Sequence, residues 1–431
     1  MKPLKVLMFG WEFPPKISGG LATACYGMLK SFSLNYPIKI VMVLPFATDE
    51  NLENVEFINA SEFPLKEHNI KLLENLINKL KKINPQEQYF SAYITPEKYQ
   101  ELIEKYKGAL ENEITKGKIS ITEGYGETLF QEIEKYGIIG AEMGKKIEHD
   151  IIHIHDWLTV KAGINAKLSS GKPLVMHVHA TEFDRSGENI NKKIYNIEKE
   201  GMMKADKIIA VSNYTKNIIS TKYGINPAKI EVVHNGSNAF EFLNINSQKH
   251  VKEKIVTFLG RITMQKGPSY FIEAAKLVLQ RTDNVRFIMA GTGDLTKKML
   301  KYVASLGISN RFHFTGFLNP YEVRKLFKIT DLYVMPSISE PFGITPLEAI
   351  QNGVPVILSK QSGVSEVLNY VIKVDFWDTH ALADAIYNIL NNNALHRMMK
   401  NLQEKEINNI TWDKSTAKII KLYYQLALAR A

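Results

Sequence analysis

Short apolar runs recur along the chain, and each is followed by a polar or glycine-rich turn and then by a stretch of helical periodicity. Continuous apolar runs are typical of parallel strands that helices cover on both faces. The runs form two series, at 6–9, 38–44, 151–155, 174–178, 207–211 and 230–233, and at 255–259, 285–290, 311–314, 332–335 and 355–358. The pattern predicts an α/β protein with two Rossmann-like, doubly wound domains that face each other across a cleft.

Strand signals stop in the polar stretch between Asn235 and Lys254, which predicts the boundary between the two series. We expect an N-terminal domain at 1–240 and a C-terminal domain at 250–411. A Lys/Glu-rich segment of helical pattern at about 60–125 interrupts the first series. Because charge runs are usually solvated faces, we interpret it as an insertion that decorates the first domain, with an acceptor or partner surface as the alternative.

The length of 431 residues fits two or three domains, and an apolar content of 45% excludes a disordered chain. The net charge of +9 favours anionic partners such as nucleotides, phosphosugars or acidic lipid. Dispersed basic residues argue against nucleic acid. The lone cysteine, Cys25, excludes an intrachain disulfide, and no apolar run approaches the ~20 residues of a membrane span, so we expect a cytoplasmic protein.

Chemistry in such folds is concentrated in the turns after the strands, because ligands bind beyond the carboxyl ends of parallel strands. In the first domain, Gly19 and Gly20 end the loop after the first strand and precede a helix, so the backbone could approach an anion there. The loop lacks the fingerprint G-x-G-x-x-G, which disfavours a dinucleotide enzyme.

Histidines follow two of the predicted strands in this domain. His155 and Asp156 come at the end of one strand, where they could meet a sugar hydroxyl. His177 and His179 are two apart on the next strand and should share a face. The polar turn that follows favours a functional His179, whereas His177 is interpreted as structural. A metal site needs convergent ligands and no HExxH pattern is present, so we expect no metal.

In the second domain, Gly260, Arg261 and Lys266 occupy the turn after its first strand. Arg261 and Lys266 are five residues apart and could converge on one dianionic group, since a guanidinium fork and a compact ammonium suit a diphosphate. Gly291 and Gly293 follow the next strand, where a Gly-x-Gly sequence permits backbone contact with a nucleotide base or ribose.

The turn after the strand at 332–335 contains two carboxylates, Glu340 and Glu348, on either side of a loop. Both could accept hydroxyl hydrogens from sugars. Thr345 and Glu348 also have the spacing of a capping box, so Glu348 could serve only to cap a helix. The loop would expose backbone N–H groups at a positive helix end, a site for phosphate; its residues are Phe342, Gly343, Ile344 and Thr345.

The chain lacks a D-x-D cluster at a strand end, a Walker-type Gly-Lys-Ser/Thr and a Ser–His–Asp elbow. These absences disfavour ATPase and esterase functions. They also leave neutralisation of a diphosphate to Arg261, Lys266 and the helix dipole, without a metal.

In these residues the chain resembles the retaining glycosyltransferases of the GT-B fold, specifically glycosyltransferase family 4 and the related glycogen and starch synthases. The segment from Glu340 to Glu348 is similar to the family's E-x7-E signature, and the segment from Gly260 to Gly267 to its G-R-x4-K-G. The resemblance implies that Arg261 and Lys266 hold the donor diphosphate. It further implies that Glu340 contacts the transferred sugar, Glu348 the ribose, and the backbone of 343–345 sugar and phosphate.

Three further segments extend the resemblance over nearly the whole chain. Lys16 to Ala22 resembles the synthase loop K-x-G-G-L with one extra residue before the glycines, and His155-Asp156-Trp157 resembles its H-D-W. His179 matches the histidine near the donor sugar. Thr411-Trp412-Asp413-Lys414 resembles the element that begins the last helix, which implies that 412–431 cross back to the first domain.

We therefore expect His179, Arg261, Lys266 and Glu340 to carry retaining transfer of a hexosyl unit, glucose first, from an ADP- or UDP-sugar to a glycan. The acceptor expected first is an α-1,4-glucan, as for glycogen and starch synthases, with no cofactor beyond the donor. One alternative is a glucosyl- or mannosyltransferase at the membrane face, acting on a lipid-linked or small acceptor with peripheral membrane contact. Another is a GT-B sugar-nucleotide epimerase or non-catalytic binder.

Overall fold

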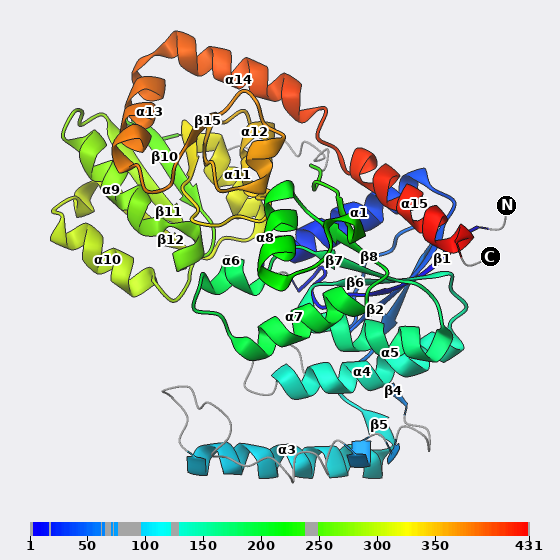
Figure 1. Ribbon diagram of the computed structural model, residues 1–431. Coiled ribbons are helices and arrows are strands. Elements are labelled where there is room, and N and C mark those ends of the chain that lie inside the picture. The colour runs from blue at the N-terminus through cyan, green and yellow to red at the C-terminus, as the bar shows by residue number, and fades with distance from the viewer. Residues whose placement is uncertain are drawn as a thin grey trace. The chain divides into compact units, whose positions relative to one another are not determined.

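The computed structural model (Figure 1) describes residues 3–16, 19–61, 63–64, 70–71, 73–75, 96–121, 129–237 and 249–429. The chain divides into two compact units. The first contains Met1–His177, Glu200–Lys207 and Leu422–Ala431, and the second contains Val178–Lys199 and Ile208–Lys421. This division differs from the expected domains at 1–240 and 250–411, whose limits stay predictions. Among the described residues, no helix is both long and apolar enough to span a bilayer.

Within the described residues, the first sheet has seven strands in the order β3-β2-β1-β6-β7-β8-β9. The pairs β3–β2, β2–β1, β1–β6, β6–β7 and β8–β9 are parallel. Every residue of the neighbouring strands β6 and β7 is buried, which explains their continuous apolar sequence. The strands are β1 (Lys5–Phe9), β2 (Lys39–Leu44), β3 (Val55–Asn59), β6 (Ile151–His155), β7 (Leu174–Val178), β8 (Lys207–Ala210) and β9 (Ile230–Val232).

Strand β3 was not expected from the sequence. It lies at the edge of the sheet, and none of its residues is fully buried, so it lacks a continuous apolar run. The helices that follow strands of this sheet are α1 (Gly20–Asn35), α5 (Val160–Ser170), α6 (Glu182–Ser186), α7 (Lys192–Lys204) and α8 (Asn213–Tyr223), and α4 (Leu129–Lys146) directly precedes β6.

The expected insertion contributes α3 (Pro96–Lys116) and a two-stranded antiparallel sheet of β4 (Phe63–Pro64) and β5 (Lys118–Ile119). It is tied to α4 through Lys135, whose ammonium lies 2.8 Å from Glu113 and donates to the carbonyl of Ser120. The Lys135 side chain is only 3% exposed. The insertion is therefore anchored by a buried charge pair; most of its residues between 65 and 95 lie outside the described part of the chain.

The second sheet has six strands in the order β12-β11-β10-β13-β14-β15, all parallel. Counted along the chain, this is the 3-2-1-4-5-6 order of a Rossmann fold, with the reversal between β10 and β13. The strands are β10 (Lys254–Leu259), β11 (Val285–Ala290), β12 (Phe312–Gly316), β13 (Leu332–Met335), β14 (Val356–Ser359) and β15 (Ile372–Val374). Strand β15 is short and half-buried at the edge, and the sequence did not reveal it.

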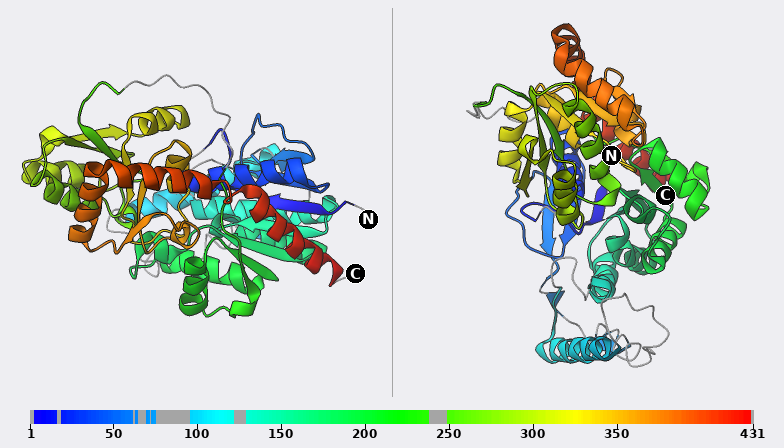
Figure 2. Two further views of the ribbon diagram at one scale, coloured as in Figure 1. Left: turned by 90° about the horizontal axis from the view of Figure 1, so that it is seen from above. Right: turned by 90° about the vertical axis from the view of Figure 1, so that its left-hand side faces the viewer.

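Helices cover both faces of this sheet (Figure 2). One core joins Phe271 and Ile386 to Val256, and a separate core joins Leu347 to Tyr333. The helices are α9 (Pro268–Leu279), α10 (Thr296–Ser305), α11 (Pro320–Ile329), α12 (Thr345–Gln351), α13 (Thr379–Asn391) and α14 (Asn393–Ile407). The expected α/β class with two Rossmann-like parallel sheets is confirmed.

The last helix, α15 (Trp412–Leu428), has its final residues in the first unit. There the Tyr423 ring stacks on Phe32 with centroids 6.1 Å apart, and its hydroxyl pairs with Nδ1 of His153. A fully buried tyrosine needs a partner for its hydroxyl, and the histidine supplies it.

Helices α4 and α5 approach so closely that glycine is required on α4. A Cβ atom built on Gly140 would lie 2.3 Å from the carbonyl oxygen of Ala162, whereas one built on Gly108 of α3 would meet no described residue within 4 Å. We expect Gly140→Ala to lower the free energy of unfolding by about 1–3 kcal/mol through overpacking. Gly108→Ala should leave it unchanged or raise it by up to about 1 kcal/mol. Denaturant titration of both variants checks this, and equal effects would contradict it.

Candidate active site

Because all strands of the second sheet are parallel, the turns that follow them lie at one edge. Backbone hydrogen bonds join these turns to one another. Gly260 N donates to Ala290 O (3.0 Å), Ile338 N to Gln265 O (2.9 Å) and Glu340 N to Gln361 O (3.0 Å). The predicted donor-binding turns therefore form one connected surface at the reversal of strand order, where ligands bind in this class of fold.

Lys266 and Glu340 form an ion pair on this surface. Lys266 ends a short 3₁₀ helix, η4 (Met264–Lys266), and Glu340 lies in the turn after β13. The carboxylate of Glu340, only 6% exposed as a residue, also accepts from Oγ of Ser337 at 3.2 Å. Arg261 is on the same turn as Lys266 and is exposed. The structure thus brings two of the predicted catalytic residues, Lys266 and Glu340, into contact and leaves a second cation, Arg261, accessible on the same turn.

Of the three glycines of these turns that we predicted to bind substrate, Gly291 and Gly293 have a packing role. A Cβ atom on Gly291 (φ 123°) would lie 2.0 Å from Gly260 O, and one on Gly293 would lie 2.3 Å from Ile262 O. The turns after β10 and β11 are therefore in backbone-to-backbone contact, which only glycine permits. Nucleotide contact by Gly260, Gly291 and Gly293 stays a prediction.

The predicted capping box at Thr345 is wrong. Residue Ile344, already in helical conformation, is the N-cap of α12, and no side chain caps the helix. Thr345 is consequently the first residue inside the helix and Glu348 lies one position too far along for a capping box. Before them, Phe342 is buried and Gly343 has φ of 100°, a conformation that favours glycine.

Glu348 therefore does not cap the helix, and the pKa of its carboxyl is shifted. Burial raises the pKa of Glu348 to about 7, although Arg324 on α11 acts in the opposite direction. A carboxyl that titrates near neutrality is typical of a functional position.

In the first unit, Gly19 is the N-cap of α1 with extended backbone. A Cβ atom on Gly19 or Gly20 would meet nothing within 4 Å of the described residues, so packing does not explain the pair. Lys16 lies with its ammonium 5.0 Å from the centroid of the Phe46 ring. Residues 17 and 18 of the predicted loop lie outside the described residues.

His155 and Asp156 lie at the end of β6, as predicted, and both are buried. Asp156 has φ of 54° and ψ of −174°, which is strained for a residue other than glycine. Its N–H donates to His177 O at 3.0 Å, and its carbonyl accepts from Thr159 Oγ1 at 3.2 Å. Strain of this kind clusters at functional sites, which supports the predicted role of Asp156.

Three histidines of the first unit lie together. His153 and His155 are two apart on β6, and His177 is the register partner of His155 on β7. Their ring centroids are 4.6 to 5.5 Å apart, and one ring nitrogen from each lies within 4.8 Å of the others, a spacing that could hold a metal ion. No local motif indicates this cluster, because adjacent strands assemble it; the expected absence of a metal stays a prediction.

His179 follows β7 directly and is half-buried. Burial lowers the pKa of His179 to about 3, so its imidazole is neutral at physiological pH. A neutral imidazole can either donate to or accept from a sugar hydroxyl.

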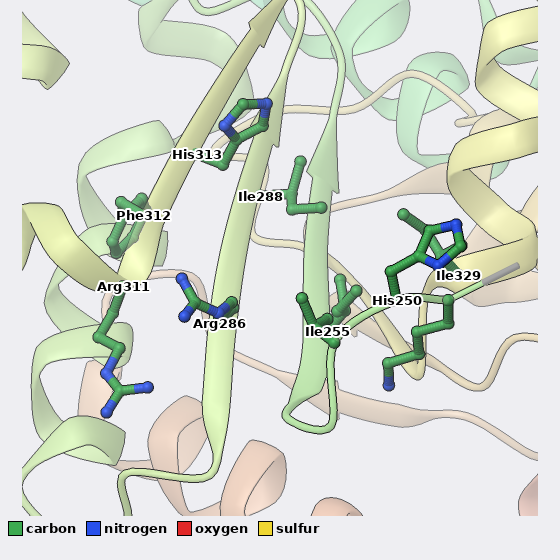
Figure 3. Close-up of a pocket in the computed structure, with 10 residues that line it drawn as sticks. His250, Ile255, Arg286, Ile288, Arg311, Phe312, His313 and Ile329 are labelled. Carbon is green, nitrogen blue, oxygen red and sulfur yellow. The ribbon is translucent and has the colours of Figure 1, made fainter.

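Figure 3 shows a pocket in the second unit. It is lined by Ile255, Arg286 and Phe312, which begin or nearly begin their strands, so it opens at the opposite, amino-terminal edge of the sheet. Arg286 there pairs with Glu253 at 2.9 Å. No residue that we predicted to bind substrate lines this pocket.

Sequence reasoning missed Ser337, Ser339 and Asp184, which hydrogen-bond on or beside the turn that contains Glu340. Ser339 Oγ donates to Asp184 Oδ1 at 2.6 Å, across 155 residues of sequence. The polar turn after β7 was the one visible signal for Asp184. Serines are too common in turns to stand out.

Two family models match adjacent parts of the chain. The model described as Glycosyltransferase Family 4 matches residues 138–239, and the model described as Glycosyl transferases group 1 matches residues 240–406. The second match contains Arg261, Lys266, Glu340 and Glu348, and the first contains His155 and His179.

Relatives and solved structures agree with these matches. An uncharacterised glycosyltransferase of Methanocaldococcus jannaschii is 26% identical over 97% of this chain and 98% of its own length. The UDP-Gal:alpha-D-GlcNAc-diphosphoundecaprenol alpha-1,3-galactosyltransferase of Escherichia coli is 28% identical over 66% of this chain and 77% of its own length. A glycogen synthase of Mycobacterium tuberculosis is 25% identical over 64% of this chain and 68% of its own length.

The sucrose-phosphate synthase of Thermosynechococcus elongatus has a TM-score of 0.71 at 17% identity, covering 99% of this chain and 100% of its own. Anabaena HepE, solved with UDP and glucose, has a TM-score of 0.65 at 16% identity and covers 98% of this chain and 100% of its own. The chain is an enzyme of the glycosyltransferase class with the GT-B fold. Within that class it is similar to glycosyltransferase family 4.

The pKa of Glu348 predicts a pH dependence of nucleotide binding. If the carboxylate accepts ribose hydroxyls, binding needs its ionised form. The dissociation constant of the nucleoside diphosphate should then rise about tenfold from pH 8 to pH 6, as one proton on a group of pKa about 7 requires. Calorimetric titration at both pH values measures it.

The Glu348→Gln variant is the control, because its binding should be weaker and independent of pH. A raised carboxyl pKa also means that the folded state binds more protons than the unfolded state, so this group lowers stability as pH rises from about 4.5 through 7. The melting temperature of the wild type relative to Glu348→Gln should fall over that range. A constant difference would contradict the pKa itself, independently of nucleotide binding.

The strain at Asp156 predicts opposite effects on stability and activity. Asp156→Gly should raise the free energy of unfolding by about 1 kcal/mol, because glycine adopts positive φ without strain. It should lower turnover if the carboxylate contacts substrate. Denaturant titration and a transfer assay on the same preparation measure both. A variant that is less stable than the wild type would refute the strain argument.

Proposed function

We propose that this glycosyltransferase moves a hexosyl unit, glucose first, from a UDP- or ADP-sugar to a glycan with retention at the anomeric carbon. The observation that carries the proposal is the ion pair of Lys266 with the nearly buried carboxylate of Glu340 at the reversal of the second sheet. Arg261 is exposed on the same turn. This set offers two cations for a diphosphate and a carboxylate acceptor for sugar hydroxyls.

The bound donor changes the partners of both residues. The diphosphate oxygens take hydrogen bonds from Lys266 and Arg261, which stabilise the negative charge that grows as the glycosidic bond to the phosphate breaks. Glu340 accepts from hydroxyls of the transferred sugar and orients it, and neutral His179 hydrogen-bonds to the same sugar. Glu340 is already engaged by Lys266 and Ser337, so it is not placed as a nucleophile. We propose attack by the acceptor on the face from which the phosphate leaves, with the phosphate taking the acceptor's proton.

The proposed acceptor is an α-glucan, supported by the likeness of the His155-Asp156-Trp157 segment to the synthases and by the matching glycogen synthase. No metal is proposed in the transfer, since Arg261 and Lys266 supply positive charge. UDP as the donor nucleotide is supported by the UDP and glucose bound in the similar Anabaena structure.

A second candidate acceptor is lipid-linked. The relative that acts on a diphosphoundecaprenol acceptor is 28% identical over 66% of this chain, and the net charge of +9 favours contact with an acidic membrane face. The two acceptors share the same donor chemistry, so an assay that varies the acceptor separates them.

The decisive experiment incubates the purified protein with a panel of nucleotide sugars, alone, with glycogen, and with a diphosphoprenol-linked sugar in vesicles. Released nucleoside diphosphate is measured, with and without EDTA. Release from UDP- or ADP-glucose that depends on glycogen supports the proposal. Release that depends on the lipid acceptor favours the second candidate, and sugar isomerisation without transfer would refute both.

Lys266→Ala and Glu340→Gln should each lower kcat/KM at least about 100-fold, as loss of an interaction made in the transition state does. Lys276→Ala is the matched control, because Lys276 lies on α9 and donates to the carbonyl of Leu306 at 3.1 Å. It should retain activity within about twofold. Near-native turnover in either site variant, with the fold intact by circular dichroism, would contradict the proposed roles.

A further inference from the structure

We propose that Asp184 and Tyr214 are positioning residues for glycosyl transfer, which hold the main chain beside Glu340 through the hydroxyl of Ser339. The inference rests on the proposed role of Glu340 in binding the transferred sugar. All of the residues that carry it belong to the second compact unit.

Glu340 is held directly by its side chain and by its backbone. Its carboxylate pairs with Lys266 and accepts a hydrogen bond from the Ser337 hydroxyl. Glu340 N donates to Gln361 O at 3.0 Å, and Glu340 O accepts from Gly363 N at 2.9 Å. The position of the carboxylate therefore depends on the position of the turn that contains it.

Ser339, the residue before Glu340, is bound by two side chains that are distant in sequence. Its Oγ donates to Asp184 Oδ1 at 2.6 Å and lies 3.0 Å from the hydroxyl of Tyr214. Because a serine hydroxyl has one proton and Asp184 takes it, Tyr214 is the donor in the second bond. The Ser339 hydroxyl is thus held by one hydrogen bond that it donates and one that it accepts.

Asp184 is itself held rigidly. Its other oxygen, Oδ2, accepts from N and Oγ1 of Thr181, both at 2.7 Å, in the capping box of α6. The residue is 2% exposed. A capping box uses one carboxylate oxygen, so the bond from Ser339 to the second oxygen is additional to the needs of the helix.

The residue after Glu340 is held as well. The carbonyl of Pro341 accepts from Ser212 Oγ at 2.6 Å, at the N-cap of α8. A Cβ atom on Gly363 would lie 2.1 Å from that carbonyl, so the turn is enclosed on this side too. The main chain is therefore fixed on both sides of Glu340. Displacement of a positioning group by about 1 Å can cost 100-fold in rate, so bonds of this kind can affect turnover without contact with substrate.

The test uses the full chain and the donor that the panel identifies. Ser339→Ala and Tyr214→Phe should each lower kcat about tenfold or more, because Glu340 then orients the sugar poorly in the transition state. The dissociation constant of the nucleoside diphosphate should change less than twofold, since Arg261 and Lys266 are unaltered. The melting temperature should stay within a few degrees of the wild type. Ser339→Thr, which keeps the hydroxyl, should restore most of the turnover.

Ser365→Ala is the matched control: its hydroxyl donates to Ser362 O at 2.6 Å in the adjoining 3₁₀ turn, η6 (Gly363–Glu366), without contact to Glu340. It should keep wild-type kcat. The double variant Asp184→Asn with Ser339→Ala should be no slower than the slower single variant, because one bond joins the two residues. The inference would be overturned if the losses of kcat in the two single variants multiplied in the double variant, or if Ser339→Ala kept wild-type kcat. Parallel losses of kcat, nucleotide binding and stability would also overturn it. Full activity in Glu340→Gln would instead overturn the proposed function on which it rests.

Discussion

A carboxylate removed from water must be compensated by charge or by hydrogen bonds, and Glu340 meets this requirement within the second sheet's turns. Lys266 supplies the opposite charge and Ser337 a hydroxyl. Because Lys266 follows β10 and Glu340 follows β13, their pairing joins the two turns at the point where the strand order reverses. Backbone hydrogen bonds to the carbonyls of Gln265 and Gln361 connect the same turns.

Under the proposed function, the same requirement makes the pair suited to a charged, hydroxylated ligand. Breaking a buried ion pair by removing one partner is costly, since it leaves the other charge uncompensated. In the proposed complex, anionic oxygens of the ligand take the place of Glu340 beside Lys266. Hydroxyl hydrogens of the ligand take the place of Lys266 beside Glu340. Nucleoside diphosphate sugars have both groups, which links the electrostatics of this turn to the glycosyltransferase class that the comparisons establish.

Glycine packing shapes the surface around the pair. The turns after β10 and β11 touch through backbone atoms at Gly260 and Gly291, and the turns after β13 and β14 touch at Pro341 and Gly363. We predicted ligand contact for Gly260 and Gly291 from the sequence, whereas the close approach of the neighbouring turn by itself requires glycine at position 291. Gly19 and Gly20 differ, because no described residue lies within 4 Å of a Cβ atom placed there.

The sequence by itself determined the parallel α/β architecture and its turns, because continuous apolar strands report burial on both faces. It also identified Lys266 and Glu340 as candidates. It could not reveal β3 and β15, whose edge positions need no continuous apolar run, nor that α12 begins with Ile344 as its cap. Only the tertiary structure decided which side chains meet: Ser339 with Asp184, and His153 and His155 with His177. Those contacts join residues far apart in the chain, and their partners depend on how strands and turns pack, which local periodicity does not encode.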